Sequence, residues 1–190
     1  MNNKPDLILD IDETLVKSYF FSVSEKSQIP LMYYQDDKLF LTNYNDDNHS
    51  IIIYKRPYLF EFLTEMKKYF NISIYSLGHT NYINIIINRI NEIYGENIFK
   101  DICANDKHNY KYFKYLHKIN VNYDNCIIID DRTDVWHINY NKLFNILPYN
   151  IPNEEDDELL KIMNKVNFYF KNLPLDENFN YIQLLKLLKN

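Results

Sequence analysis

Short apolar runs alternate with helical patterns along this chain, and the alternation predicts the fold class. Apolar runs typical of strands buried on both faces cover residues 7–9, 72–75 and 126–129. Between these runs, apolar residues recur at helical spacing over 59–70 and 82–94. Strands that alternate with helices favour an α/β fold with a doubly wound, mainly parallel sheet.

Weaker patterns predict the remaining elements. Pro57 stands where the first residue of helix 59–70 is expected, and Gly95 is placed to end helix 82–94. The acidic run 154–158 precedes apolar spacing from Leu159, which predicts a solvated acidic segment at a helix N-terminus. The other expected elements are strands at 101–104 and 144–147 and helices at 110–118 and 181–189.

The pattern changes over residues 20–54. Short β-type segments at 31–34, 39–41 and 51–54 are separated by polar turns. We interpret this stretch as a small antiparallel β insertion that follows the first strand, inside a single domain of residues 1–190.

Composition and charge exclude several classes of function. The chain holds 2 glycines, so it has no Gly-rich phosphate loop of the nucleotide-binding kinds. The net charge of −5 disfavours direct binding to nucleic acid. No apolar run approaches the length of a membrane span and the N-terminus is polar, so we expect a soluble, intracellular chain without membrane contact. The 2 cysteines have no zinc-site spacing.

Pairs of acidic residues follow two of the predicted strands. Asp10 and Asp12 come after run 7–9, and their spacing places both carboxylates on one side of an extended segment. Asp130 and Asp131 come after run 126–129. Ligands bind outside the carboxyl ends of parallel strands, so the pairs are expected to meet there. Such a cluster indicates Mg²⁺ and phosphate chemistry, with one carboxylate as nucleophile and another as general acid and base.

Ser76 and Lys114 are candidate site residues only in combination with those carboxylates. Ser76 follows run 72–75, and its hydroxyl can donate to a phosphate oxygen, although a serine after a strand is more often a turn or helix cap. Lys114 falls on the predicted helix 110–118, where a lysine is usually solvated. An EF-hand starting at Asp10 is excluded, because Leu15 and Phe21 stand where that loop needs Gly and Glu.

Five segments carry a resemblance to the haloacid-dehalogenase superfamily. They are LILDIDETLVKS, KRPYLFEFL, ISIYSLGHTNYI, CIIIDDRTDVW and EEDDELLKIMNKVNFYFKNL, the last of which resembles a C-terminal helix. Within this superfamily, the chain is most similar to the RNA polymerase II C-terminal-domain phosphatases and NLI-interacting-factor-like proteins, whose signature DLDETLVHS is close to the first segment. The resemblance covers nearly the whole chain and implies a phosphoserine or phosphothreonine phosphatase that acts through an aspartyl-phosphate.

The resemblance also implies roles for individual residues. Asp10 would be the nucleophile, Asp12 the acid and base, and Asp130 the group that orients a phosphate-binding lysine. Lys114 matches that lysine, with Lys111 as the alternative. The remaining implied roles are phosphate binding by Ser76, Mg²⁺ binding by Asp10, the Asp12 carbonyl and Asp131, and substrate binding by Thr14, Arg56 and Arg132.

The expected partner is a phosphorylated peptide or protein, with the RNA polymerase II C-terminal domain as the candidate implied by the resemblance. The chain would then be nuclear, and otherwise cytoplasmic. Two segments could form a cap over the site, one between Asp12 and Arg56 and one between Ser76 and Lys114. Both are too short for a lid that seals the site from water, which favours an extended peptide over a small ligand as the substrate. Tyr33, Tyr34, Phe40 and Tyr44 either line a groove for such a peptide or pack the hairpins.

Two alternatives stay open at this point. Besides a protein phosphatase, the chain could be a phosphatase for a small phosphate ester or a catalytically silent binding module of the same fold. The intact set of acidic residues and lysine argues against silence.

Overall fold

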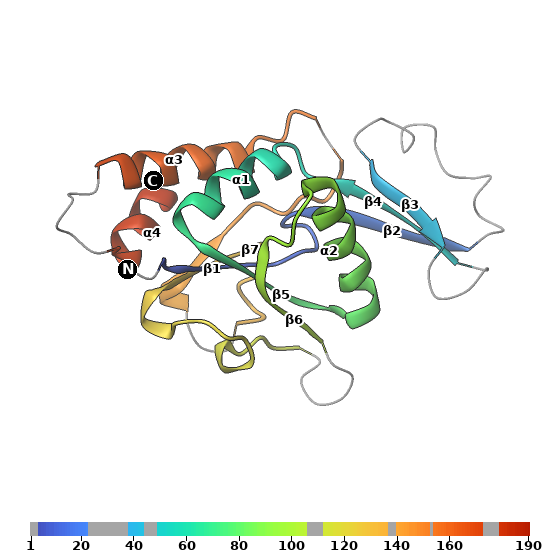
Figure 1. The fold of residues 1–190 in the computed structure, drawn as a ribbon, viewed down its shortest axis with the longest axis horizontal. Coiled ribbons are helices and arrows are strands. Elements are labelled where there is room, and N and C mark those ends of the chain that lie inside the picture. Colours follow the sequence, from blue (N-terminus) through green and yellow to red (C-terminus); the bar gives the residue numbers. More distant parts are fainter. Residues whose placement is uncertain are drawn as a thin grey trace.

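A five-stranded parallel sheet forms the centre of the molecule, with strand order β6-β5-β1-β7-β8 (Figure 1). The computed structural model describes residues 4–22, 38–43, 49–105, 112–136, 140–152, 154–172 and 179–190. The strands are β1 (Asp6–Leu9), β5 (Asn71–His79), β6 (Phe99–Asn105), β7 (Cys126–Asp130) and β8 (Leu143–Asn145). From β1 the chain winds first to β5 and β6 and then to β7 and β8, so the predicted doubly wound α/β fold is confirmed.

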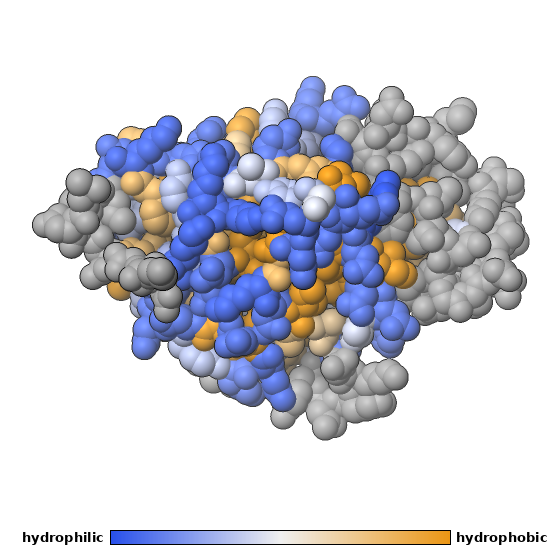
Figure 2. Space-filling view, viewed as in Figure 1, coloured by the Kyte–Doolittle hydropathy of each residue, from blue (hydrophilic) through white to orange (hydrophobic). Residues whose placement is uncertain are grey.

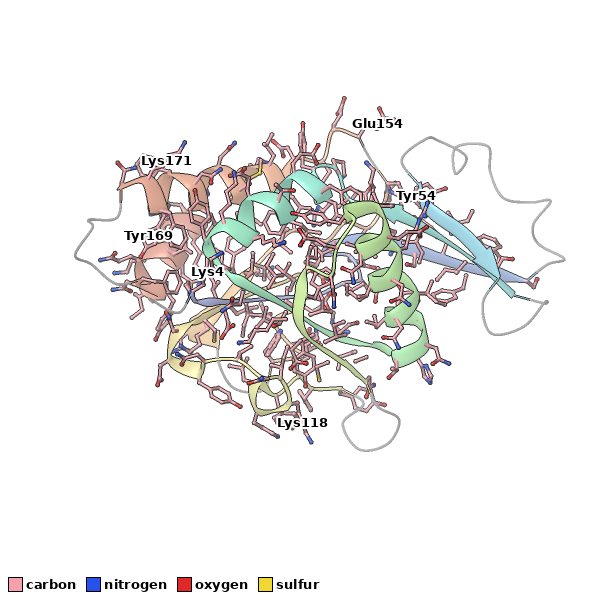
Figure 3. The ribbon with its side chains drawn as sticks, viewed as in Figure 1. Lys4, Tyr54, Lys118, Glu154, Tyr169 and Lys171 are labelled. Atoms are coloured by element: carbon pink, nitrogen blue, oxygen red, sulfur yellow. The ribbon has the colours of Figure 1, made fainter. Side chains whose placement is uncertain are left out.

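Four α-helices pack on one face of this sheet. They are α1 (Leu59–Tyr69), α2 (Thr80–Tyr94), α3 (Glu158–Asn172) and α4 (Tyr181–Lys189). Each turns an apolar stripe inward; α1, for example, buries Phe62, Leu63 and Met66 against the core that Leu7 and Leu9 of β1 help to form. Figure 3 shows side chains filling the space between helices and sheet, and Figure 2 shows polar residues around a broad apolar area in the middle of the visible face.

The opposite face of the sheet carries a second apolar cluster, because alternate strand residues point to opposite sides. Ile8 and Ile128 pack there with Trp136 and Leu116. The predicted helix 110–118 is wrong for its described part: residues 112–118 contain one helical turn, the 3₁₀-helix Leu116–Lys118. At Lys114 the backbone instead forms a β-bridge to Trp136, so tertiary pairing overrides the helical pattern.

A separate antiparallel sheet has the order β2-β4-β3 and is formed by β2 (Val16–Ser22), β3 (Lys38–Asn43) and β4 (His49–Lys55). This is the predicted β insertion, but its first strand starts at Val16, before the expected position 20. The predicted strand 31–34, and the side chains of the four aromatic residues proposed for a peptide groove, lie outside what the structure describes.

Several boundaries differ from the sequence pattern. Helix α1 begins at Leu59 after Tyr58, whose φ of 64° is left-handed, so Pro57 is not its first residue. Strand β5 continues through His79 rather than ending at Ser76. Gly95 ends α2 as predicted, with a φ of 85°. In the part of the chain that the structure describes, no helix is both long and apolar enough to span a membrane.

Candidate active site

The loop after β1 brings the first two acidic residues to the carboxyl edge of the sheet. Two backbone hydrogen bonds close this loop, because the N–H groups of Leu15 and Val16 both donate to the Ile11 carbonyl, at 2.9 and 3.1 Å. Glu13 is left-handed, with a φ of 62°, a conformation that is unfavourable for this residue type. The reversal leaves Asp10 and Asp12 beside the ends of β5 and β7.

Arg56 holds this loop from inside the protein. Its side chain is 0% exposed, and Nη1 donates to the carbonyls of Thr14 (3.1 Å) and Glu13 (3.3 Å). Nη2 donates to the Leu147 carbonyl at 2.7 Å, while Nε and Nη2 form a two-pronged pair with Asp156 at 2.7 and 2.8 Å. The predicted substrate-binding role of Arg56 does not fit this position, because its guanidinium is turned inward to these partners and does not line the cavity described below.

Asp156 also corrects the prediction that the acidic run 154–158 is only a solvated helix start. Its Oδ1 accepts from the N–H of Glu158, the first residue of α3, which agrees with the expected place at a helix N-terminus. The same carboxylate, however, is the counter-ion of the buried Arg56. The sequence signals that a carboxylate lies near a helix start, but not which buried cation it meets about a hundred residues away in the chain.

Lys114 is the cation at the centre of the acidic cluster. Its side chain is buried, and Nζ donates to Asp10 Oδ1 at 2.5 Å and to Asp130 Oδ2 at 2.6 Å. Its backbone N–H donates to the Val135 carbonyl at 2.7 Å, within the bridge that replaces the predicted helix. Lys111, the alternative lysine, lies outside the described residues.

Asp130 is fixed by donors on both carboxylate oxygens. Oδ2 also accepts from Trp136 Nε1 at 2.8 Å, and Oδ1 accepts from the Arg132 N–H at 2.8 Å. Trp136 is fully buried and was missed by the sequence reasoning; its only signal is its place in the same segment as the acidic pair, at the end of CIIIDDRTDVW. Asp130 is therefore fixed in place and accepts a hydrogen bond from Lys114 Nζ.

A cavity of about 260 Å³ opens between these strand ends. The residues with predicted catalytic or metal-binding roles that line it are Asp10, Asp12, Ser76, Lys114, Asp130 and Asp131. Arg132 lines it as well, and its exposed guanidinium pairs with Asp134. Thr14 does not line it: its hydroxyl donates to Asp131 Oδ1 at 3.2 Å and accepts from the Asp131 N–H at 3.1 Å. Thr14 thus positions Asp131 instead of meeting a ligand.

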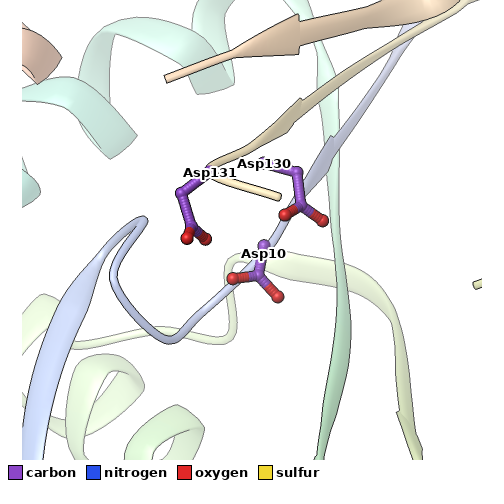
Figure 4. Close-up of side chains that lie close together, drawn as sticks. All are labelled: Asp10, Asp130 and Asp131. Atoms are coloured by element: carbon purple, nitrogen blue, oxygen red, sulfur yellow. The ribbon is translucent and has the colours of Figure 1, made fainter. Parts of the chain in front are cut away.

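Three carboxylates face a common space in the cavity (Figure 4). One oxygen from each of Asp10, Asp130 and Asp131 lies within 4.8 Å of the others. Oxygen ligands of this kind suit a hard divalent cation such as Mg²⁺. Asp130 already accepts three hydrogen bonds, so Asp10 and Asp131 are the side chains best placed to bind a metal ion.

The charges of the site are unbalanced without a further cation. Burial raises the pKa of Asp10, and the Asp130 and Asp12 carboxylates raise it further, although Lys114 opposes them. Burial and Asp130 raise the pKa of Asp131 to about 6. Burial alone would lower the pKa of Lys114, but Asp10 and Asp130 outweigh it and raise that pKa, so the lysine stays charged. A divalent cation would balance the excess of carboxylates, and the site therefore fits Mg²⁺.

Ser76 presents a hydroxyl group to the same cavity. Its Oγ accepts from the Gly78 N–H at 2.9 Å, which leaves the hydroxyl proton to donate elsewhere. A Cβ at Gly78 would lie 2.9 Å from Ile83 Cδ1 and 3.0 Å from Tyr82 Cδ1, so glycine lets the first turn of α2 approach the end of β5 closely. Gly78 and Tyr82 were not predicted as site residues.

Comparison with known proteins places this geometry in a family. The family model of the NLI interacting factor-like phosphatases matches residues 5–173. The chain belongs to this family. Among its curated relatives are CTD small phosphatase-like protein 1 of Caenorhabditis elegans, 26% identical over 68% of the chain, and Phosphatase PSR1 of Saccharomyces cerevisiae, 27% identical over 67% of the chain. The aligned part spans 24% and 28% of the length of these relatives.

A solved structure of a fission yeast protein shares the fold. It is the RNA polymerase II CTD phosphatase Fcp1-R271A bound to beryllium fluoride, which aligns with a TM-score of 0.58 and 19% identity. The alignment covers 98% of this chain and 62% of that one. At this identity the likeness shows the fold, and it agrees with the family assignment.

Proposed function

We propose that the chain is a Mg²⁺-dependent protein phosphatase that removes phosphate from serine or threonine through a phosphorylated Asp10. The observation that carries this proposal is the placement of Lys114 between Asp10 and Asp130 at a cavity that Asp12, Asp131 and Ser76 also line. Family membership supports a phosphatase of this type.

The first half of the reaction uses the free oxygen of Asp10. Lys114 holds Oδ1, while Oδ2 accepts no hydrogen bond from any residue of the described ranges, so Oδ2 is the atom available to attack phosphorus. A bond forms between Oδ2 and phosphorus as the bond from phosphorus to the serine or threonine oxygen breaks. Asp12, two residues along the loop, gives its proton to the departing oxygen.

The second half releases phosphate. Asp12, now a carboxylate, takes a proton from a water molecule, whose oxygen bonds to phosphorus while the bond to Asp10 breaks. This step regenerates the Asp10 carboxylate and the protonated carboxyl group of Asp12. The Lys114 ammonium and the Ser76 hydroxyl would bind the non-bridging phosphate oxygens. Mg²⁺ held by Asp10, Asp131 and the Asp12 carbonyl would supply further neutralisation of the phosphate charge.

A peptide is the substrate class that the surroundings of the cavity favour. Phe20 of β2 is 55% exposed and packs against Tyr82, with ring centroids 5.5 Å apart, near Asp12. An exposed aromatic side chain that packs on the tyrosine bonded to Asp12 suits the apolar part of an extended chain. The names of the relatives point to the C-terminal domain of RNA polymerase II as a candidate substrate, which would make the chain nuclear.

The test compares esters with and without metal. The parent chain is expected to hydrolyse a phosphoserine heptad-repeat peptide with Mg²⁺ and to lose activity with EDTA, and kcat/KM for the peptide should exceed that for glucose phosphates and phosphoglycolate. A small phosphate ester turned over tenfold faster than every peptide would instead support a small-molecule phosphatase. Failure to hydrolyse even p-nitrophenyl phosphate would indicate a silent binding module.

A further inference from the structure

Asp12 is held by a chain of two hydroxyl groups that reaches the small sheet. The Tyr82 hydroxyl, from the first turn of α2, donates to Asp12 Oδ1. The Tyr82 oxygen lies 2.6 Å from Ser18 Oγ, which belongs to β2. Strand β2 follows the Asp12 loop directly, whereas α2 is distant in sequence, and both elements thus contribute a hydroxyl group beside the side chain with the proposed acid and base role.

The proton count fixes the direction of this chain. A tyrosine hydroxyl has one proton, and Tyr82 gives it to Asp12, so the hydrogen bond from Ser18 must run from its Oγ to the Tyr82 oxygen. Asp12 Oδ1 is then occupied as an acceptor. Oδ2 accepts no hydrogen bond from the residues that the structure describes, so Oδ2 is the oxygen left to carry the transferred proton.

The tyrosine ring itself is closely confined. Tyr82 is buried, and Gly78 lies so close to the ring that a Cβ at position 78 would be 3.0 Å from Tyr82 Cδ1. The Phe20 ring also packs against the Tyr82 ring, with the centroids 5.5 Å apart. A ring fixed in this way presents its hydroxyl at one place, and that fixes the rotamer of Asp12.

We propose that Tyr82 and Ser18 are positioning residues that aim Asp12 Oδ2 at the leaving oxygen, and that Ser18 acts through Tyr82. This inference rests on the proposed function and extends it, because a residue of the small β sheet then affects proton transfer by Asp12. Neither hydroxyl needs to touch the substrate.

Substrates whose leaving groups differ in basicity distinguish a misplaced Asp12 from a general loss of activity. A serine oxygen must be protonated as it departs, whereas p-nitrophenolate is stable as an anion and depends far less on an acid. The quantity to compare is kcat/KM, because it reports on the steps up to the release of the leaving group. For each variant, the ratio of kcat/KM for a phosphoserine peptide to that for p-nitrophenyl phosphate is measured relative to the parent.

Tyr82→Phe keeps the ring and removes the hydroxyl. We expect its ratio to fall by at least about tenfold, since a hydrogen bond to a charged group is lost, with the peptide KM unchanged within about twofold. Tyr169→Phe is the matched control, because Tyr169 is also buried and bonded through its hydroxyl, but to Asn180 beside α4 (Figure 3). Its ratio should equal that of the parent.

Ser18 provides the second, independent variant. Ser18→Ala should lower the ratio by about threefold in the parent, and Ser18→Thr, which keeps the hydroxyl on a strand, should restore it. In a Tyr82→Phe background, Ser18→Ala should change the ratio no further, because the link it acts through is already broken.

Failure of the positioning role and failure of the proposed function give different results. Equal losses for both esters, or a full Ser18→Ala effect in the Tyr82→Phe background, would overturn the positioning role while leaving the phosphatase proposal in place. A parent that turns over neither ester with Mg²⁺ would overturn the proposed function, and this inference with it.

Discussion

Replacing Arg56 with alanine should destabilise the whole domain and not merely weaken substrate binding. The change removes a fully buried guanidinium that bonds the carbonyls of Glu13, Thr14 and Leu147 and pairs with Asp156. Breaking a buried ion pair from one side costs about 3–5 kcal/mol. The unfolding entropy of a 190-residue chain is about 0.4 kcal/mol/K, so the expected loss in Tm is about 8–12 °C.

Thermal unfolding followed by circular dichroism measures this change, and steady-state kinetics measures its effect on activity. Arg132→Ala is the matched control, because its side chain is 58% exposed and its guanidinium pairs with the exposed Asp134 on the surface. An exposed pair of this kind contributes at most about 1 kcal/mol, so Tm should fall by no more than about 2 °C.

A double variant refines the test. Arg56→Ala with Asp156→Ala should lose less stability than the sum of the two single changes, since no buried charge is then left without its partner. The reasoning is refuted if Arg56→Ala keeps the parent Tm within about 2 °C and raises KM tenfold. That outcome would restore the substrate-binding role predicted from the sequence.

Three further predictions concern the site. Thr14→Val should raise the Mg²⁺ concentration needed for half-maximal activity about tenfold, because Asp131 loses its hydroxyl partner; an unchanged requirement in a metal titration would contradict this. Lowering the pH from 7.5 to 5.5 should raise the same requirement at least about fourfold, since Asp131, with its pKa of about 6, must lose its proton to bind metal and the raised pKa of Asp10 acts in the same direction; a requirement independent of pH would remove Asp131 from the metal site. Trp136→Phe should lower the free energy of unfolding by about 1–3 kcal/mol, because the buried Asp130 loses a donor, and urea denaturation that shows no change would contradict the role assigned to Trp136.

The convergence of the acidic residues could be predicted from local sequence. Asp10 and Asp130 directly follow apolar runs of the kind that form buried parallel strands, and parallel strands carry their C-terminal residues to one edge. The register pairs Leu9 with Ile129, which sets the two acidic residues side by side. The fold class followed from the same alternation of strands and helices.

Contacts between segments distant in sequence could not be predicted in this way. The spacing of Phe113 and Leu116 predicts a helix at Lys114, but a β-bridge to Trp136 determines its backbone and two buried carboxylates hold its side chain. Tyr82 is the first residue of the predicted helix 82–94, and no local pattern shows that its hydroxyl meets Asp12. Such partners are set by tertiary packing, which a single sequence does not display.

The identity of the phosphorylated residue tests the central claim most directly. A phosphoserine peptide labelled with ³²P is mixed with the protein and Mg²⁺, the reaction is stopped with acid within milliseconds, and the labelled segment of the protein is mapped. We predict an acyl-phosphate on Asp10, released by hydroxylamine and lost in Asp10→Asn, which keeps the parent Tm. Label on any other residue, or rapid turnover with no labelled enzyme and full activity in Asp10→Asn, would contradict the account.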